Sequence, residues 1–239
     1  MIERLASIRS TNAALAERIT RGESVPEGHW LIADRQTAGR GRQGREWFDG
    51  AGNFMGSTVV LPRFGDPPPS SLALVAGLAL IEAIAPCLQP PQQAVLKWPN
   101  DVMIGNAKLA GVLLERVGDS VVVGIGVNLA AAPNLPDRKT MALSAFGPAP
   151  DRDLFAARLA DCLSQDLNRW RSYGLGAIIA RWLAAAHPLG TLLEVGEPGE
   201  PFLKGTFAGL TDDGALLLGL SGATTRVIHA GEVRLAMSD

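Results

Sequence analysis

The succession of short strands between residues 94 and 128 constrains the fold more than any other feature of this chain. The segment is rich in valine, leucine and isoleucine, and the dipeptides Gly105-Asn106 and Gly118-Asp119 interrupt it. Two-residue turns of this kind connect antiparallel neighbours. The expected strands are Ala94–Trp98, Asp101–Ile104, Ala107–Arg116 and Val121–Asn128. This part of the chain therefore predicts a continuous antiparallel sheet.

Helical and extended patterns on either side of this segment complete the predicted fold. Helices are expected at Asn12–Ile19, Leu72–Cys87, Leu154–Trp170 and Ala177–Ala186, and further strands at His29–Asp34 and Asn53–Leu61. Together these elements predict an α+β domain over residues 1–187, with a mixed, largely antiparallel sheet and helices on one face.

Beyond His187–Gly190 the pattern changes to short strands and turns alone. The expected strands are Thr191–Val195, Phe202–Leu210, Ala215–Leu220, Thr225–His229 and Val233–Ala236. Short strands at this spacing are typical of a small β-barrel. We therefore expect a second domain over residues 188–239.

Charge and composition exclude several classes of function. The net charge is −2 at pH 7, and positive charge is concentrated in one short loop, which argues against a nucleic-acid-binding face. The apolar stretch Leu72–Ala85 is interrupted by Gly77 and Glu82 and is too short to span a bilayer, and the N-terminus does not resemble a signal peptide. Cys87 and Cys162 have no partner at a metal-binding or redox spacing. We therefore expect a cytoplasmic protein that binds neither nucleic acid nor membrane.

The run Gly39–Arg45 reads GRGRQGR and combines glycine with arginine. Arginine presents a permanent charge on a rigid fork of donors, and glycine lets backbone N–H groups approach a ligand closely. The run lacks the Gly-Lys-Ser/Thr ending of a Walker loop and the spacing of a Rossmann loop. A solvated surface turn is the structural alternative, but the bulky Trp47 and Phe48 that follow favour a lid. We interpret the run as an anion-binding loop that orders when its anion arrives.

A second polar group lies at Lys97–Asp101 (KWPND) and continues in Lys108–Gly111 (KLAG). With a two-residue turn between the strands, Met103 lies opposite Lys108, and Asp101 is one diagonal step from Lys108 on the same face. An ion pair between Asp101 and Lys108 is therefore expected. One interpretation is a cross-strand pair that only stabilises the sheet. The other is a phosphate-binding lysine held by an acid that also binds Mg²⁺ or accepts a proton.

Two further motifs are open to both a structural and a functional interpretation. Gly124–Asn128 (GIGVN) places two glycines inside a strand, which indicates close approach of a ligand or of another backbone. Ser10-Thr11-Asn12 is explained by helix capping alone. Neither motif decides a function by itself.

Taken together, these motifs resemble those of the biotin protein ligases. They occur in the order of that family, namely Ser10-Thr11-Asn12, Gly39–Gly44, Lys97–Asp101 with Lys108–Gly111, and Gly124–Asn128. The resemblance extends over essentially the whole chain. It implies a catalytic domain similar to class II aminoacyl-tRNA synthetases, followed by an SH3-like barrel.

The resemblance also implies a role for each motif residue. Binding of biotin, its adenylate or ATP is expected from Ser10, Thr11, Asn12, Gln36, Gly39, Arg40, Gly41, Arg42, Arg45, Trp47, Asn100, Lys108, Gly111 and Asn128. Ser10, Thr11 and Gln36 correspond to contacts with the ureido ring of biotin, and Gly39 and Arg40 to contacts with its carboxylate and adenylate.

The remaining implied roles concern the nucleotide and the chemistry. Arg42 and Arg45 are expected to face phosphate, and Trp47 to cover the intermediate as a lid. The expected catalytic residues are Lys108, Arg40 and Asp101. Lys108 corresponds to a contact with the biotin carboxylate and the α-phosphate, and Asp101 is the expected Mg²⁺ ligand or proton acceptor.

The implied reaction joins biotin to a lysine of the biotin carboxyl carrier protein of acetyl-CoA carboxylase, with ATP and Mg²⁺, through biotinyl-5′-AMP. The Ser-Thr-Asn motif begins at residue 10, which leaves no room for the DNA-binding domain of many relatives. We therefore expect a ligase that does not bind DNA, as a monomer or a homodimer.

Two alternatives remain at this point. A lipoate or octanoate ligase or transferase shares the general fold and the lysine acylation, but the GRGRQG run disfavours it. A non-enzymatic, biotin-responsive binding protein is disfavoured by the expected lack of a DNA-binding domain and by the near-neutral charge.

Overall fold

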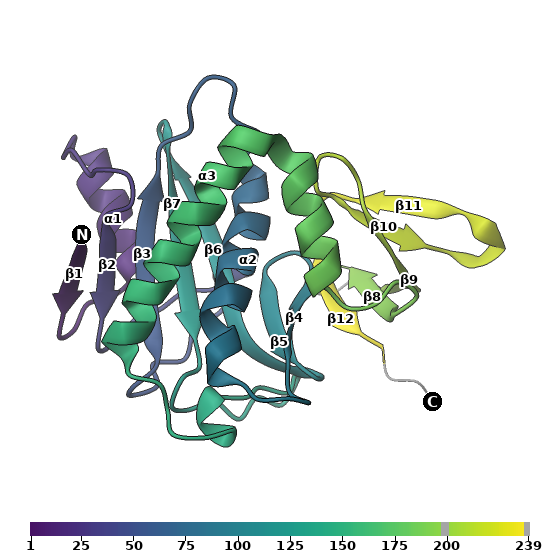
Figure 1. Ribbon diagram of the computed structural model, residues 1–239, viewed down its shortest axis with the longest axis horizontal. Coiled ribbons are helices and arrows are strands. Elements are labelled where there is room, and N and C mark those ends of the chain that lie inside the picture. Colours follow the sequence, from purple (N-terminus) through teal and green to yellow (C-terminus); the bar gives the residue numbers. More distant parts are fainter. Residues whose placement is uncertain (197–200, 237–239) are drawn as a thin grey trace.

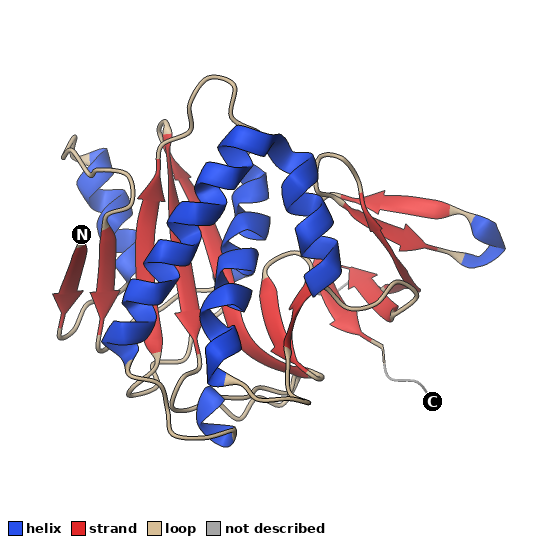
Figure 2. Ribbon diagram, in the orientation of Figure 1, coloured by secondary structure: helices blue, strands red, loops and turns tan. Residues whose placement is uncertain are grey.

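The computed structural model describes residues 1–196 and 201–236 and has the expected α+β architecture (Figures 1 and 2). A seven-stranded sheet forms its centre, in the order β1-β2-β3-β7-β6-β5-β4. Strands β1 and β2 are parallel, and the other neighbours in this sheet are antiparallel. The strands are β1 (Ile2–Leu5), β2 (Trp30–Ala33), β3 (Phe54–Val60), β4 (Ala94–Lys97), β5 (Asp101–Ile104), β6 (Ala107–Val117) and β7 (Ser120–Val127).

Helices cover both faces of this sheet, so the expectation of helices on one face was wrong. Helices α2 (Leu72–Ile84) and α3 (Arg152–Ala185) pack on one face, and α1 (Thr11–Thr20) packs on the other (Figure 1). The neighbouring residues Trp30 and Leu31 of β2 belong to two separate buried clusters. Successive side chains of a strand point to opposite faces, so these clusters are the two layers of the core.

The N-terminal strand β1, which the sequence pattern did not predict, is tied to α1. Glu3 accepts two hydrogen bonds from the Arg18 guanidinium, both 2.7 Å long. These bonds outweigh the cost of burial and lower the pKa of Glu3 to about 2. Helix α1 itself begins after Ser10, whose hydroxyl accepts a hydrogen bond from the Ala13 N–H at 3.4 Å.

Helix α2 is the most apolar segment of the fold. With its flanking turns it spans Pro69–Cys87, 19 residues that by length and composition alone are able to cross a membrane. This segment is longer than Leu72–Ala85, the apolar stretch expected from the sequence to be too short to span a bilayer. Most of α2 is buried, and it packs against α3 as well as against the sheet. Its position in the core explains its composition, since a helix that is apolar all round is buried.

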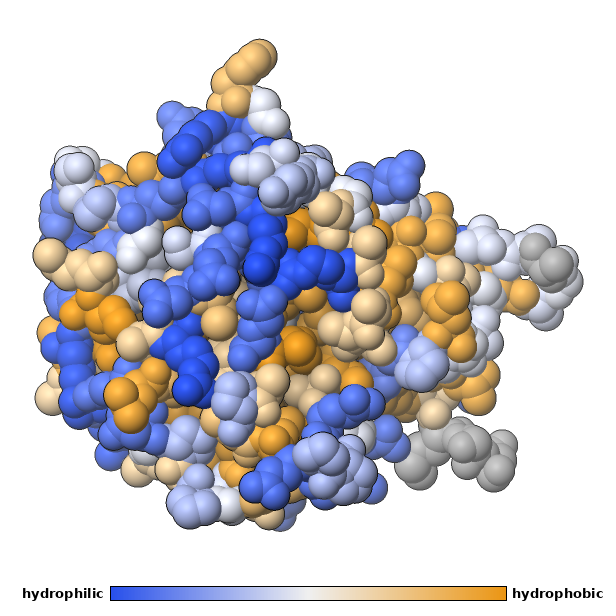
Figure 3. Space-filling model, in the orientation of Figure 1, coloured by the Kyte–Doolittle hydropathy of each residue, from blue (hydrophilic) through white to orange (hydrophobic). Residues whose placement is uncertain are grey.

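Helix α3 contains the two predicted C-terminal helices, joined at Gly174, whose φ is 74°. Glycine adopts such a positive φ without steric cost, so the helix breaks there and folds back (Figure 1). Arg181 after the break then forms an ion pair with the fully buried Asp166 before it, and Arg169 contacts the same carboxylate at 2.8 Å. A hydrophilic band follows the outer side of α3 (Figure 3).

A second sheet of five antiparallel strands follows α3, in the order β11-β10-β9-β8-β12. Its strands agree with the predicted ones and are β8 (Leu192–Gly196), β9 (Leu203–Leu210), β10 (Leu216–Gly219), β11 (Thr225–Ile228) and β12 (Glu232–Leu235). Trp182 of α3 packs edge-on against Phe207 with ring centroids 6.3 Å apart. The Lys97 ammonium donates to the Val233 carbonyl at 2.8 Å, which brings β12 next to the large sheet.

Candidate functional site

A cavity of about 540 Å³ opens on the α1 side of the large sheet. Every predicted binding or catalytic residue except Gly39 lines it. Gly39 lies behind the lining, where a Cβ would be 3.1 Å from both the Gln36 amide nitrogen and the Trp47 carbonyl. The structure thus brings the predicted residues together, and their roles in binding stay predictions.

Three glycines in neighbouring strands form what we call the glycine floor of the cavity. Gly124 and Gly126 belong to β7, and Gly126 pairs with Gly111 of β6, which in turn pairs with Asp101 of β5. A Cβ on Gly124 would lie 2.8 Å from the Asn12 Cγ, and a Cβ on Gly126 would lie 2.6 Å from the Trp47 indole nitrogen. These glycines are required because other side chains lie directly on the backbone.

A buried, uncharged cluster lies at the Gly124 end of the floor. The Gln36 side-chain oxygen accepts from the Thr11 backbone N–H at 2.7 Å and from the Thr11 hydroxyl at 3.1 Å. The Ser57 hydroxyl lies 2.7 Å from that of Thr11 and donates to Asn12 at 2.6 Å. Asn12 also donates to Glu115 at 2.7 Å. Mutual hydrogen bonds fix these groups in position around the cavity.

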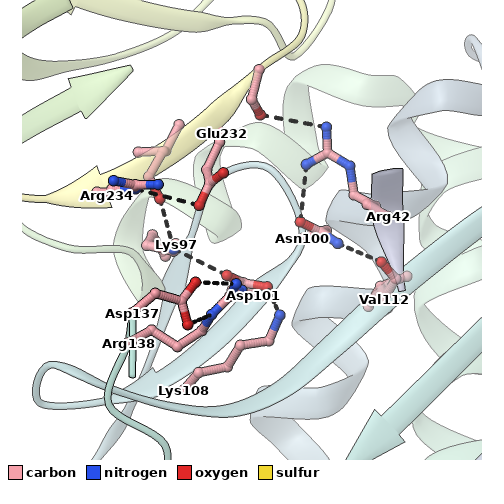
Figure 4. A network of polar contacts seen from close by, with 12 residues as sticks. Arg42, Lys97, Asn100, Asp101, Lys108, Val112, Asp137, Arg138, Glu232 and Arg234 are labelled. Carbon is pink, nitrogen blue, oxygen red and sulfur yellow. Dashed lines mark hydrogen bonds and ion pairs between the residues drawn. The ribbon is translucent and has the colours of Figure 1, made fainter. Parts of the chain in front are cut away.

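Asp101 lies between two lysines at the other end of the floor (Figure 4). Its carboxylate is 2.5 Å from the Lys108 ammonium and 3.0 Å from that of Lys97. Burial alone would raise the pKa of Asp101, but the two ammonium groups hold it well below its usual range. The predicted pairing of Met103 with Lys108 is confirmed, but the register shifts between Val102 and Met103, so that Asp101 pairs with Gly111.

The arginine–glycine loop folds over the cavity as a small hairpin. The Gly41 N–H donates to the Arg45 carbonyl at 2.7 Å, and the Trp47 N–H donates to Gly39 at 2.9 Å. Arg40 pairs through its backbone with Glu46. The Arg40 side chain is exposed and makes no ion pair within the described part of the chain. Whether the loop orders only with an anion stays a prediction.

The same loop reaches the second sheet (Figure 4). Arg42 donates to Asn100 at 3.2 Å and to the Gly231 carbonyl at 3.4 Å. Arg45 forms an ion pair with Glu232 of β12. Burial would raise the pKa of Glu232, but the hydrogen bond from Arg45 lowers it. Strand β12 is therefore part of the cavity wall.

Trp47 lies across the glycine floor. Its ring contacts the backbone at Gly126, and the Lys108 ammonium is 5.6 Å from the ring centroid, within range of a cation–π contact. The indole N–H is buried and has no hydrogen-bond partner among the described residues. The ring therefore lies over the middle of the cavity, and its role as a lid stays a prediction.

Two asparagines complete the wall around the lysines. The Asn100 amide donates to the Val112 carbonyl at 2.5 Å, and the Asn128 amide donates to Met141 at 3.1 Å. The Asn128 side-chain oxygen is buried and unpartnered within residues 1–196 and 201–236. It is available to accept a hydrogen bond from a bound molecule.

Sequence reasoning missed several lining residues, among them Ser57, Arg138 and Glu232. Ser57 had a signal, because it is a polar residue inside the buried strand FMGSTVV. Arg138, in the loop after β7, and Glu232, in β12, belong to no motif. They reach the cavity only through the packing of segments distant in sequence.

Comparisons with known proteins define the class to which this fold and site belong. The model of the biotin/lipoate A/B protein ligase family matches residues 5–130, and that of the biotin protein ligase C-terminal domain matches residues 194–235. The chain belongs to this ligase family.

Within this family of biotin and lipoate ligases, three individual proteins that this chain resembles are biotin ligases. The chain is 38% identical to the biotin–[acetyl-CoA-carboxylase] ligase of Paracoccus denitrificans, over 96% of this chain and 98% of that protein. It is 37% identical to the Mycobacterium tuberculosis ligase of the same name, over 96% of this chain and 86% of that protein. The fold matches the Aquifex aeolicus biotin protein ligase in complex with biotin and ATP with a TM-score of 0.85 and 28% identity, covering 98% of this chain and 99% of that chain.

Proposed function

We propose that this protein attaches biotin to a lysine of the biotin carboxyl carrier domain of acetyl-CoA carboxylase, through biotinyl-5′-AMP. The two chemically different ends of the glycine floor carry this proposal. The uncharged cluster around Thr11 and Gln36 suits a neutral ureido ring. The lysines and arginines at the Asp101 end suit a carboxylate and a triphosphate.

In the first step, a biotin carboxylate oxygen bonds to the α-phosphorus of ATP while the bond to the β-phosphate oxygen breaks. Both reactants are anions, so charge repulsion and orientation are the main obstacles. Fixed cations address both obstacles, and Lys108 is positioned for this by its ion pair with Asp101 at 2.5 Å. Pyrophosphate leaves without any need for a serine or histidine nucleophile.

In the second step, a neutral lysine amine of the carrier attacks the acyl carbon, the amide forms, and the bond to AMP breaks. The amine must lose a proton. A carboxylate whose pKa lies far below neutrality is a weak proton acceptor at pH 7. We therefore propose that Asp101 mainly positions Lys108 and Lys97, and its role as a base is tested below.

Magnesium is proposed to enter with ATP. No group of three or more His, Cys, Asp or Glu side chains is placed to hold a metal ion in residues 1–196 and 201–236. A nucleotide-borne Mg²⁺ takes most of its ligands from phosphate and water, so one protein carboxylate is enough. Asp101 is our proposed ligand, and the ion would neutralise phosphate charge there.

Biotin-dependent ATP–pyrophosphate exchange tests the proposed function. The purified chain is expected to exchange labelled pyrophosphate into ATP with biotin and not with lipoate. Addition of a carrier domain is then expected to yield one biotinylated lysine, detected by mass spectrometry. Exchange with lipoate alone would instead identify a lipoate ligase, and no exchange with either acid would favour a binding protein.

A further inference from the structure

The loop that follows β7 is attached to the site at Lys108. The Lys108 backbone N–H donates to the Lys139 carbonyl, and the Met141 N–H donates to the Lys108 carbonyl, both at 2.9 Å. The chain around Thr140 therefore forms a short parallel bridge beside Lys108. This attachment places Arg138, two residues before Thr140, at the cavity.

Arg138 is oriented by its neighbour Asp137 (Figure 4). The guanidinium donates to both carboxylate oxygens, at 2.6 and 3.3 Å. The pKa of Arg138 is raised, first by the hydrogen bonds that it donates to Asp137 and further by the charges of Asp137, Glu232 and Asp101. The guanidinium therefore lines the same cavity as the acid of the large sheet and the acid of β12.

Four of the cations at this end of the cavity have a carboxylate partner: Lys97 and Lys108 share Asp101, Arg45 has Glu232, and Arg138 has Asp137. These partners differ in burial. The Asp101 and Glu232 side chains are each 12% exposed, whereas the Asp137 side chain is 49% exposed. An ion pair with a half-exposed carboxylate is weak. A polyphosphate therefore displaces Asp137 from its cation more easily than it displaces the other two acids.

The position of Arg138 along the cavity indicates which phosphates it meets. The floor runs from the uncharged cluster at Gly124, past Trp47 and Lys108, to Asp101. Arg138 lines this end of the cavity together with Lys108, Asp101 and Glu232 (Figure 4). An ATP molecule with its α-phosphate at Lys108 would extend its outer phosphates toward Arg138.

We propose that Arg138 binds the β- and γ-phosphates of ATP, and that Asp137 holds the guanidinium in position before ATP arrives. This inference rests on the proposed adenylate-forming step. The outer phosphates leave as pyrophosphate and are absent from the second step. Arg138 therefore matters for adenylate formation and not for transfer of biotin to the carrier.

Separate assays of the two half-reactions test this proposal. Arg138→Ala is expected to raise the KM for ATP in pyrophosphate exchange by about tenfold to a hundredfold, the usual effect of losing charged hydrogen bonds. The KM for biotin and the rate of transfer from purified biotinyl-5′-AMP are expected to stay within about twofold of wild type. Arg138→Lys, which keeps the charge but loses the fork, is expected to lie in between.

Lys139→Ala is the matched control, since Lys139 is the next residue, carries the same charge and does not line the cavity. It is expected to leave both half-reactions unchanged. An unchanged KM for ATP in Arg138→Ala would overturn the proposal, and so would an equal loss in both half-reactions, which indicates a structural role. Failure of the proposed function itself is distinguishable, because the wild-type chain would then show no exchange.

Discussion

Replacing Gly126 by alanine is expected to displace the Trp47 lid without unfolding the sheet. A Cβ at this position would lie 2.6 Å from the indole nitrogen and closer still to the ring carbons. Strand β7 is paired along its length with β3 and β6 and is not free to shift. Trp47 comes from a loop, so the indole is the group that moves.

The free energy lost on displacement follows from the contacts of the ring. A tryptophan that is partly buried removes about 100 Å² of apolar surface from water, worth about 2.5 kcal/mol at 25 cal/mol per Å². The contact with the Lys108 ammonium adds about 0.5 kcal/mol. If the Trp47 ring tilts instead of leaving the cavity, it keeps part of this contact free energy. We therefore expect release of biotinyl-5′-AMP to be faster by about 10- to 100-fold, which corresponds to about 1.4–2.7 kcal/mol.

A chase assay measures this release directly. Enzyme carrying radiolabelled biotinyl-5′-AMP is diluted into unlabelled intermediate, and the label that remains bound is followed with time. Trp47→Ala is expected to release the intermediate at a rate similar to that of Gly126→Ala. The double variant is expected to release it no faster than the faster single variant, because both substitutions remove the same contact. Thermal unfolding of each variant controls for loss of the fold. Unchanged release from Gly126→Ala, or additive effects in the double variant, would refute the assignment of Trp47 as the lid.

Three further predictions concern other parts of the molecule. Gly124→Ala would place a Cβ 2.8 Å from the Asn12 Cγ, and is expected to raise the KM for biotin about tenfold in pyrophosphate exchange, with the KM for ATP unchanged. Asp101→Asn is expected to slow adenylate formation at least about tenfold, since it leaves two partly buried ammonium groups without their carboxylate. Transfer from preformed adenylate is expected to keep its pH profile, and loss of that pH dependence would assign Asp101 as the base. For Glu3, the folded pKa of about 2 lies below the ordinary value of 4.5, so its stabilising effect is present above pH 4.5 and is lost as the pH falls toward 2. The difference in unfolding free energy between wild type and Glu3→Gln, measured with urea, is expected to shrink across that range, and a constant difference would contradict it.

Local patterns explain why so much of the large sheet could be predicted. The two-residue turn after Ile104 determines the register of β5 against β6, so the pairing of Met103 with Lys108 follows from sequence alone. The ion pair between Asp101 and Lys108 forms as predicted, although an irregularity between Val102 and Met103 shifts the register and pairs Asp101 with Gly111. Even the break in α3 is marked by a local signal, the glycine at 174.

Long-range packing explains what could not be predicted. Strand β1 has only four residues, half of them exposed, and it forms because β2 offers a free edge. The face chosen by α1 depends on the tertiary fold, and the burial of every residue of β3 in the structure reflects the cover on both faces. Arg138 and Glu232 reach the cavity from segments that carry no motif.

The contacts of β12 explain how a segment without a motif contributes to the site. Among the described residues, two contacts of β12 and the preceding Gly231 use backbone carbonyls, since Arg42 donates to Gly231 at 3.4 Å and Lys97 donates to Val233 at 2.8 Å. Any residue supplies a carbonyl, so the sequence there is not constrained by these bonds. The ion pair of Arg45, by contrast, requires a particular side chain, Glu232. The second sheet therefore positions the arginine loop mainly through the path of its backbone, and a displacement of β12 would move the loop even where every motif residue is intact.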